Sequence, residues 1–331
     1  MKPVLPWLFC LLLLLSACSP SPPEAHESRF MMGTLVEFTV YGVPRAKAAA
    51  AIRAAANAMQ EAADSLTIYG DVENTVKAFN ASRPGVPVQL PAAVSALLTQ
   101  AKTVERQSHG AFSPVLGSLS LLWGFSTPTP PSRPPGEEDI RRALAGVGPK
   151  LLRRLATPAH TWVRLHEQTR LDFGGIGKGY AIDIGIAVLR KHGIEHALIN
   201  AGGDMRAIGR HGERPWRIGI RHPRQAGAVL ATLDLEGDVS VVTSGDYERF
   251  FIYRGRRYHH ILNPGNGWPA DKSQSVTVIA ENATLADAWS TALFVLGPKG
   301  LELLKKRHMD ALLVDAGGDI HTTPGMKKRL K

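Results

Sequence analysis

The sequence predicts an α+β fold in which helices pack against a mainly antiparallel sheet. Strand-like segments follow one another at short intervals through the second half of the 331 residues, and short turns favour antiparallel pairing. Two long apolar stretches of helical length interrupt these strands and end directly before Gly193 and Gly297. The first half instead holds segments in which apolar residues recur at helical spacing. No internal repeat is strong enough to suggest a repeat protein.

The first half is expected to contain one strand and three helices. Residues 34–41 alternate as a half-buried strand does. The alanine-rich residues 44–66 place Ile52, Met59 and Leu66 on one helical face, which is the pattern of core packing. The other expected helices are the segment between Pro91 and Gly110 and residues 139–144, and the proline-rich residues 126–136 are an expected surface loop.

The second half is expected to be rich in strands, with two long helices among them. The expected helices are residues 178–192 and 283–296. The expected strands are residues 161–165, 169–173, 196–200, 216–221, 229–235, 239–242, 250–253, 275–279 and 311–314.

The N-terminus predicts export followed by attachment to a lipid. Lys2 precedes an unbroken apolar run, Trp7–Leu15, that is shorter than the ~20 residues needed to span a bilayer. The segment LSAC, which ends at Cys18, resembles the lipobox of bacterial lipoproteins and implies a lipid on the Cys18 sulfur. We therefore expect residues 1–17 to be a signal peptide and residues 18–28 to be a tether. An ordinary secretory signal with a chance cysteine is the alternative.

Composition is that of a globular protein, long enough for one large domain or two small ones. Hydrophobic residues make up 44% and charged residues 21% of the chain. The net charge is +10, but the basic residues are scattered and form no stripe with aromatic residues, which argues against nucleic-acid binding. Cys10 and Cys18 are the only cysteines, so no disulfide framework is expected. The basic residues 324–331 are expected to form a solvated tail.

The most informative stretch is LDFGGIGKGY, from Leu171 to Tyr180. A glycine-rich turn followed by a helix start favours phosphate binding, and Lys178 adds a full positive charge there. The stretch is not a Walker A loop, because Asp172 stands where that loop requires glycine. Its glycine spacing also differs from the dinucleotide-binding fingerprint. Tight packing between a helix and a strand is the alternative explanation for the glycines.

Two further turns follow strands and carry polar groups. Asn200 to Asp204 contains two glycines that could lie against a ligand. Thr243 to Tyr247 offers hydroxyls and backbone N–H groups suited to an anion.

Histidine, carboxylate and hydroxyl groups mark two more candidate positions. His259 and His260 lack a third metal ligand at useful spacing, so His260 is expected to act in catalysis or phosphate contact rather than in a metal site. The alternative is a strand end with one imidazole outward and one in the core. Asp287 and Thr291 lie four residues apart on an expected helix, and their oxygens suit a hard cation such as Mg²⁺.

In their order along the chain, these motifs resemble the FAD:protein FMN transferase (ApbE) family. The resemblance runs from about Met31 to beyond Leu296 and implies an ApbE-like, T-fold-like domain over residues 29–323. The motifs that carry it are Met32-Gly33-Thr34, Gly110-Ala111-Phe112, Asp172 through Gly179, Gly202-Gly203-Asp204, Thr243 through Tyr247, His260 through Pro264, and Asp287 with Thr291.

The resemblance implies a protein that binds FAD and Mg²⁺, moves FMN onto a threonine or serine hydroxyl of an exported acceptor protein, and releases AMP. The residues implied to contact FAD are Met32, Tyr69, Ala111, Phe112, Ser113, Asp172, Lys178 and Ile261. The implied Mg²⁺ ligands are Asp287, Thr291 and the backbone carbonyl of Gly175, with Ser290 as an additional candidate. His260 is the first candidate for the base and Asp172 the second, while Lys178 is expected to neutralise phosphate charge.

The acceptor itself is not identifiable, and two other functions stay open. One is an FAD pyrophosphatase that uses water, and the other is a flavin-binding lipoprotein without turnover. A lipid on Cys18 would hold the protein at the periplasmic face of a bacterial membrane. The chain departs from the family pattern at Ser113 and Val115, where aspartate and threonine are usual.

Overall fold

The computed structural model describes residues 23–331, apart from residues 128 and 130. The expected signal peptide, Cys18 and the first part of the expected tether lie outside these residues. The helices are α1 Arg45–Leu66, α2 Thr75–Ala81, α3 Ala92–Gln107, α4 Gly117–Trp123, α5 Glu137–Leu144, α6 Gly177–Lys191, α7 Ala283–Leu296, the 3₁₀ helix η1 Pro298–Leu304 and α8 Pro324–Arg329. The strands are β1 Glu24–Met31, β2 Thr34–Tyr41, β3 Val88–Gln89, β4 Leu152–Arg154, β5 Thr161–Arg164, β6 Ala197–Ala201, β7 Asp204–Ile208, β8 Trp216–Arg221, β9 Val229–Leu235, β10 Val239–Gly245, β11 Phe250–Tyr253, β12 Arg256–His259, β13 Ser273–Ala280, β14 Asp310–Asp315 and β15 Ile320–Thr322.

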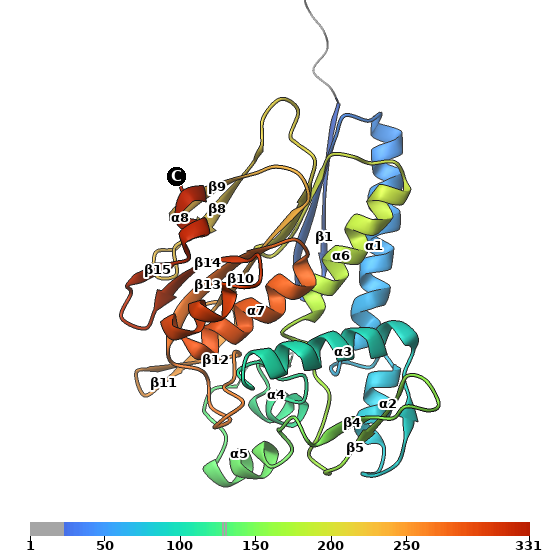
Figure 1. Cartoon of the computed structure of the whole chain (residues 1–331), viewed down its shortest axis with the longest axis vertical. Coiled ribbons are helices and arrows are strands. Elements are labelled where there is room, and N and C mark those ends of the chain that lie inside the picture. The colour runs from blue at the N-terminus through green and yellow to red at the C-terminus, as the bar shows by residue number, and fades with distance from the viewer. Residues whose placement is uncertain (1–22, 128, 130) are drawn as a thin grey trace, which may run out of the picture.

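An eight-stranded sheet forms the centre of the molecule (Figure 1). Its strand order is β1-β2-β6-β7-β10-β13-β14-β15, and every neighbouring pair is antiparallel. Every residue of β13 is buried, as expected for a strand near the middle of a sheet that is covered on both faces. The predicted α+β class with a mainly antiparallel sheet is therefore confirmed.

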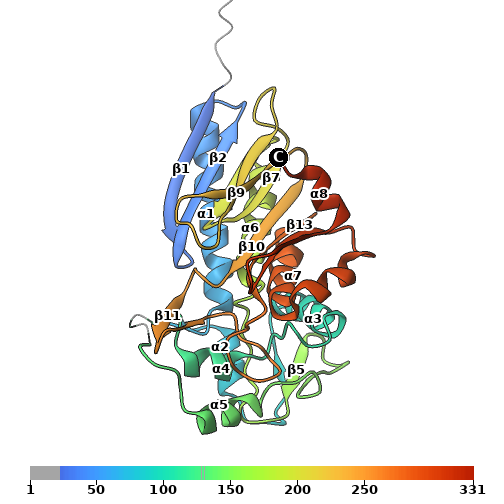
Figure 2. The same ribbon diagram turned by 90° about the vertical axis from the view of Figure 1, so that its left-hand side faces the viewer.

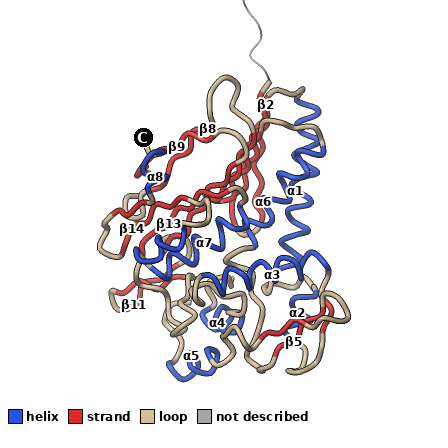
Figure 3. Tube along the Cα trace, in the orientation of Figure 1, coloured by secondary structure: helices blue, strands red, loops and turns tan. Residues whose placement is uncertain are grey.

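Three helices, α1, α6 and α7, cover one face of this sheet (Figures 1 and 3). Small residues let them pack closely. Ala51 and Ala55 of α1 are fully buried in the core that α1 shares with α6. A Cβ added to Gly179 of α6 would lie 2.1 Å from the carbonyl oxygen of Ala283, so only glycine allows α6 to approach the start of α7 this closely. This contact brings the glycine-rich turn beside α7.

The opposite face of the sheet is covered by the β8–β9 hairpin and α8 (Figure 2). Ile218 and Leu233 of the hairpin pack in one apolar cluster with Leu312 of the sheet and Met326 of α8. Residues 324–331 are thus only in part a solvated tail, because the side chains of Lys327, Lys328 and Arg329 are exposed but the segment forms α8 and packs against the sheet. Met326 is fully buried, and Leu330 forms a bridge with Leu233, because the amphipathic end of the chain completes the cluster.

Two further expectations differ from the structure. Residues 169–173 form one isolated β-bridge but no strand. The side chain of Asn80 accepts the Leu171 N–H at 2.6 Å and donates to the Leu171 carbonyl at 2.9 Å, so these backbone groups are not available to a neighbouring strand. The expected tether ends earlier than residue 28, since β1 begins at Glu24 and pairs with β2 over its whole length. In the described part of the chain, no helix is long and apolar enough to cross a membrane.

Candidate active site

A cavity of about 650 Å³ opens beside the N-terminus of α6 and the middle of α7. Its walls come from the β1–β2 turn, the segment after α1, the segment after α3, the glycine-rich turn, the end of β10, and the segment after β12. With the exception of Ser290, every predicted FAD, metal and catalytic residue lines it. These residues are Met32, Tyr69, Ala111, Phe112, Ser113, Asp172, Gly175, Lys178, His260, Ile261, Asp287 and Thr291.

The turn between β1 and β2 forms one edge of the cavity. Met31 pairs with Thr34, which leaves Met32 and Gly33 as a two-residue turn with φ values of 54° and 70°. Two positive φ values in a two-residue hairpin turn match type I′, whose twist suits paired strands. The guanidinium of Arg249 lies against Gly33, since a Cβ on that glycine would be 2.9 Å from Nη2.

The glycine-rich turn leads into α6 and is braced by Asp172. The Asp172 carboxylate accepts hydrogen bonds from the Gly174 N–H at 2.8 Å and the Ser120 hydroxyl at 2.5 Å. Burial raises the pKa of Asp172 above its ordinary value. Helix α6 then begins at Gly177 with no acidic residue in its own first turn, so the partial positive charge of its N-terminus favours negative groups beside it, and the Asp287 carboxylate is one of them because it accepts the Gly179 N–H.

Lys178 brings a full positive charge to the same place. It forms an ion pair with Asp204, whose other oxygen accepts the Thr243 N–H at 3.2 Å. Burial alone would lower the pKa of Lys178, but the carboxylates of Asp204 and Asp287 raise it above its ordinary value. The ammonium is therefore charged at neutral pH and held on the cavity wall.

A group of oxygen atoms lines the same cavity as this lysine. Asp287 accepts the Gly179 N–H at 2.9 Å, and burial together with the charge of Asp204 raises its pKa to about 7. The Thr291 hydroxyl lies beside the backbone of Gly175, 3.2 Å from where a Cβ would stand. Carboxylate, hydroxyl and carbonyl oxygens are the ligands that Mg²⁺ prefers. This donor set fits a magnesium ion. The ion would also supply a positive charge beside the buried carboxylate of Asp287.

Among the described residues, no group of three His, Cys, Asp or Glu side chains is arranged to hold a metal ion. A cation at this place would thus depend on hydroxyl and backbone oxygens as well as on Asp287. Ser290 does not line the cavity and is fully buried. Its hydroxyl donates to the backbone carbonyl of Asp287 at 2.9 Å and lies 2.8 Å from the Ser244 hydroxyl. Ser290 thus supports two residues that line the cavity near Thr291, namely Asp287 and Ser244.

The two adjacent histidines have different surroundings. Nε2 of His259 lies 2.8 Å from the carbonyl oxygen of Ala270 in the interior. His260 lines the cavity, and its buried Nδ1 has no hydrogen-bond partner among the described residues. Burial, with the positive charges of Arg249 and Lys178 nearby, lowers the pKa of His260 to about 3. His260 is therefore a neutral imidazole at pH 7, and its lowered pKa makes it a weak base as long as the cavity holds no anionic ligand.

The remaining wall is mostly apolar. Phe112 and Ile261 are almost fully buried and line the cavity together with Tyr69, whose pKa is raised by burial and by the charge of Asp172. Ser113 donates its hydroxyl to the buried carboxylate of Glu105 at 2.6 Å. The serine that departs from the family pattern thus has a partner on α3, and Val115 lies in the core.

Several residues of the site were not predicted. Ser120, Glu248 and Arg249 line the cavity, and Glu105 supports it from α3. None of them belongs to a motif, and only the fold brings them to the site. Glu248 and Arg249 had a weak local signal, because they directly follow the polar turn that ends at Tyr247.

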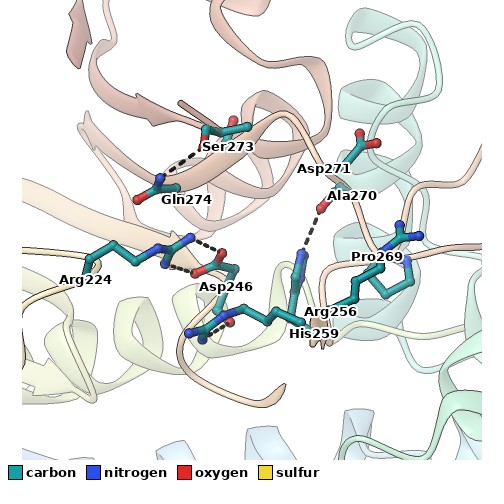
Figure 4. Close-up of a pocket in the computed structure, with 11 residues that line it drawn as sticks. Arg224, Asp246, Arg256, His259, Pro269, Ala270, Asp271, Ser273 and Gln274 are labelled. Carbon is teal, nitrogen blue, oxygen red and sulfur yellow. Dashed lines mark hydrogen bonds and ion pairs between the residues drawn. The ribbon is translucent and has the colours of Figure 1, made fainter. Parts of the chain in front are cut away.

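A smaller cavity of about 140 Å³ lies behind that turn (Figure 4). Thr243, Ser244 and Gly245 face the large cavity, whereas Asp246 faces the small one. Arg224 donates two hydrogen bonds of 2.7 Å to the Asp246 carboxylate, as Figure 4 shows. The loop of the β8–β9 hairpin thus fixes Asp246, and the residues directly before Asp246 line the candidate active site.

The match to a family model decides the relationship of this chain to known proteins. Residues 32–313 match the ApbE family. The chain belongs to the ApbE family. A Treponema pallidum FAD:protein FMN transferase is 32% identical, over 98% of this chain and 94% of that protein. A Rhodobacter capsulatus protein of the same name is 33% identical over 93% of this chain, which spans 59% of that relative. The ApbE protein of Thermotoga maritima has a similar structure, with a TM-score of 0.85 and 33% identity over 93% of this chain and all of that one.

Proposed function

We propose that this protein transfers the FMN part of FAD to a serine or threonine hydroxyl of an acceptor protein, in a magnesium-dependent reaction that releases AMP. The observation that carries the proposal is the placement of Lys178 and the α6 N-terminus beside the oxygen donors Asp287 and Thr291 in one cavity. Positive groups beside a hard-cation site suit a diphosphate. The names of the relatives support the same activity.

The positive groups of the site would bind the diphosphate and hold it in place. Lys178 and the partial positive charge of the α6 N-terminus would attract the phosphate oxygens. Asp287, Thr291 and the carbonyl of Gly175 would hold Mg²⁺, which when bound neutralises charge on the leaving phosphate. The apolar wall formed by Phe112 and Ile261 would take the ring systems of FAD.

The acceptor hydroxyl must lose its proton as its oxygen bonds to the FMN-side phosphorus. The bond from that phosphorus to the AMP oxygen breaks in the same exchange, and AMP leaves. His260 is the favoured base because its neutral imidazole lines the cavity, and the negative charge of a bound diphosphate would raise its lowered pKa. Both carboxylate oxygens of Asp172 already accept hydrogen bonds, which makes Asp172 the second candidate.

The experiment is to incubate the protein with FAD, Mg²⁺ and a protein accepted by one of its relatives, and to weigh the products by mass spectrometry. Transfer adds the mass of FMN to the acceptor and releases AMP. AMP and free FMN with an unmodified acceptor would instead identify an FAD pyrophosphatase. FAD that stays intact while bound would identify a flavin-binding protein without turnover.

The N-terminal pattern supports a proposal about location. A lipid on Cys18 would hold the enzyme at the periplasmic face of a bacterial membrane, where exported acceptors arrive. Cys18→Ser should release the protein from the membrane fraction and abolish labelling by a radioactive fatty acid. Retention of both properties in that variant would refute the proposed anchor.

A further inference from the structure

The outer face of the β1–β2 hairpin is polar except at its tip. The cross-strand pairs His26–Thr39 and Ser28–Glu37 lie on this face, and Phe30–Leu35 is the next pair on it. The Phe30 side chain is 80% exposed and that of Leu35 is 51% exposed. The alternate residues of β2 point the other way and are buried in the core, so the fold itself does not use this apolar pair.

This exposed pair, which we call the tip pair, stands at the mouth of the candidate active site. Met32, Gly33 and Thr34, which lie between Phe30 and Leu35 in the sequence, line the cavity, whereas Phe30 and Leu35 do not. A ligand inside the cavity is therefore not expected to cover the tip pair. A larger partner that lies on the mouth of the cavity would cover the tip pair.

We propose that the tip pair is a docking contact for the acceptor protein, taking an apolar side chain close to the acceptor hydroxyl. The inference rests on the proposed function. A transfer reaction requires that hydroxyl to reach a phosphorus atom beside Lys178, inside the cavity. A cavity of about 650 Å³ that would also hold FAD has no room for a protein domain, so the acceptor must lie on the mouth.

Other features of the mouth suit a polypeptide. Val72 lines the cavity and is 46% exposed, which gives a second apolar position at the opening. Exposed aromatic side chains that become buried on binding are frequent anchors of protein interfaces. A membrane is the competing partner, but Glu37 lies on the same outer face of the hairpin as the tip pair. Two apolar side chains beside a carboxylate are a poor match for an anionic bilayer.

The test compares the double variant Phe30→Ser/Leu35→Ser with wild type and with Ile320→Ser. Ile320 is 54% exposed and lies on β15, at the opposite edge of the sheet, so it controls for loss of an exposed apolar residue. The double variant should raise the KM for the acceptor about tenfold or more, since interface anchors commonly contribute that much. The KM for FAD and the release of FMN to water should stay at the wild-type level.

Further measurements keep the inference testable. Phe30→Leu should restore most of the acceptor affinity, because it keeps an apolar side chain at the tip. The affinity for the acceptor is also titrated without FAD, which tests the docking contact even if no FMN is transferred. An absence of FMN transfer then counts only against the proposed function. An unchanged acceptor affinity in the double variant overturns the inference. So does a loss of binding to vesicles of anionic phospholipid with no change in acceptor affinity, which would assign the tip pair to the membrane.

Discussion

His260 gives a stability prediction that does not depend on any ligand. Its pKa falls from 6.5 to about 3 on folding because the imidazole is largely removed from water and lies near positive charges. Above pH 6.5 the imidazole is neutral in both states. As the pH falls below 6.5, the unfolded chain takes up a proton that the folded chain refuses, so stability is lost. Between pH 7.5 and 5.0 this loss amounts to about 2 kcal/mol.

The assay is urea unfolding of wild type and His260→Gln at these two pH values. The wild type should lose about 2 kcal/mol more stability than the variant on going from pH 7.5 to 5.0, because glutamine does not titrate. His192→Gln, which changes an exposed histidine at the end of α6, serves as the matched control and should behave as wild type. An equal pH dependence in wild type and His260→Gln would refute the reasoning that a buried, neutral imidazole faces the cavity.

Three more predictions follow from contacts at the site. Asp287→Asn should lower FMN transfer by about 100-fold or more and remove the thermal stabilisation by Mg²⁺, measured by calorimetry; full activity would exclude Asp287 as a metal ligand. Gly179→Ala should cost about 3 kcal/mol or more in urea unfolding, because its Cβ would overlap the Ala283 carbonyl, and an unchanged midpoint would contradict that packing. Arg224→Ala should lower stability by about 1–3 kcal/mol and raise the KM for FAD, because it leaves the Asp246 carboxylate unpaired. The added change Asp246→Asn should recover part of that stability, and no recovery would argue against the ion pair as the cause.

Elements with strong local patterns could be predicted from the sequence. The helix over residues 283–296 has the predicted bounds, since an apolar stretch is followed at once by Gly297. β1 is not predicted because it is an edge strand in which charged residues are mixed with small ones. This composition is typical of a polar linker, and only the pairing with β2 makes the segment a strand. The false strand at residues 169–173 shows the opposite case, in which a distant side chain, that of Asn80, replaces the expected strand partner.

The site was predictable to the extent that its residues lie in ordered motifs. Motif order gave Lys178, Asp287 and His260, and all three line one cavity. The sequence could not give the Lys178–Asp204 ion pair, because it depends on how the turn before β7 meets the start of α6. It also could not give the exposure of Phe30, since an apolar residue in a strand is normally expected to face the core.

With the proposed lipid on Cys18, β1 would also set how far the enzyme can work from a membrane. The strand starts at Glu24, and its other end carries the turn at the mouth of the cavity. Its eight residues span about 26 Å. With a lipid on Cys18, residues 19–23 would form a linker that spans at most about 21 Å from Cys18 to β1. The mouth would then stay within about 50 Å of the bilayer, a working height that selects acceptors whose hydroxyl lies in the layer next to the membrane.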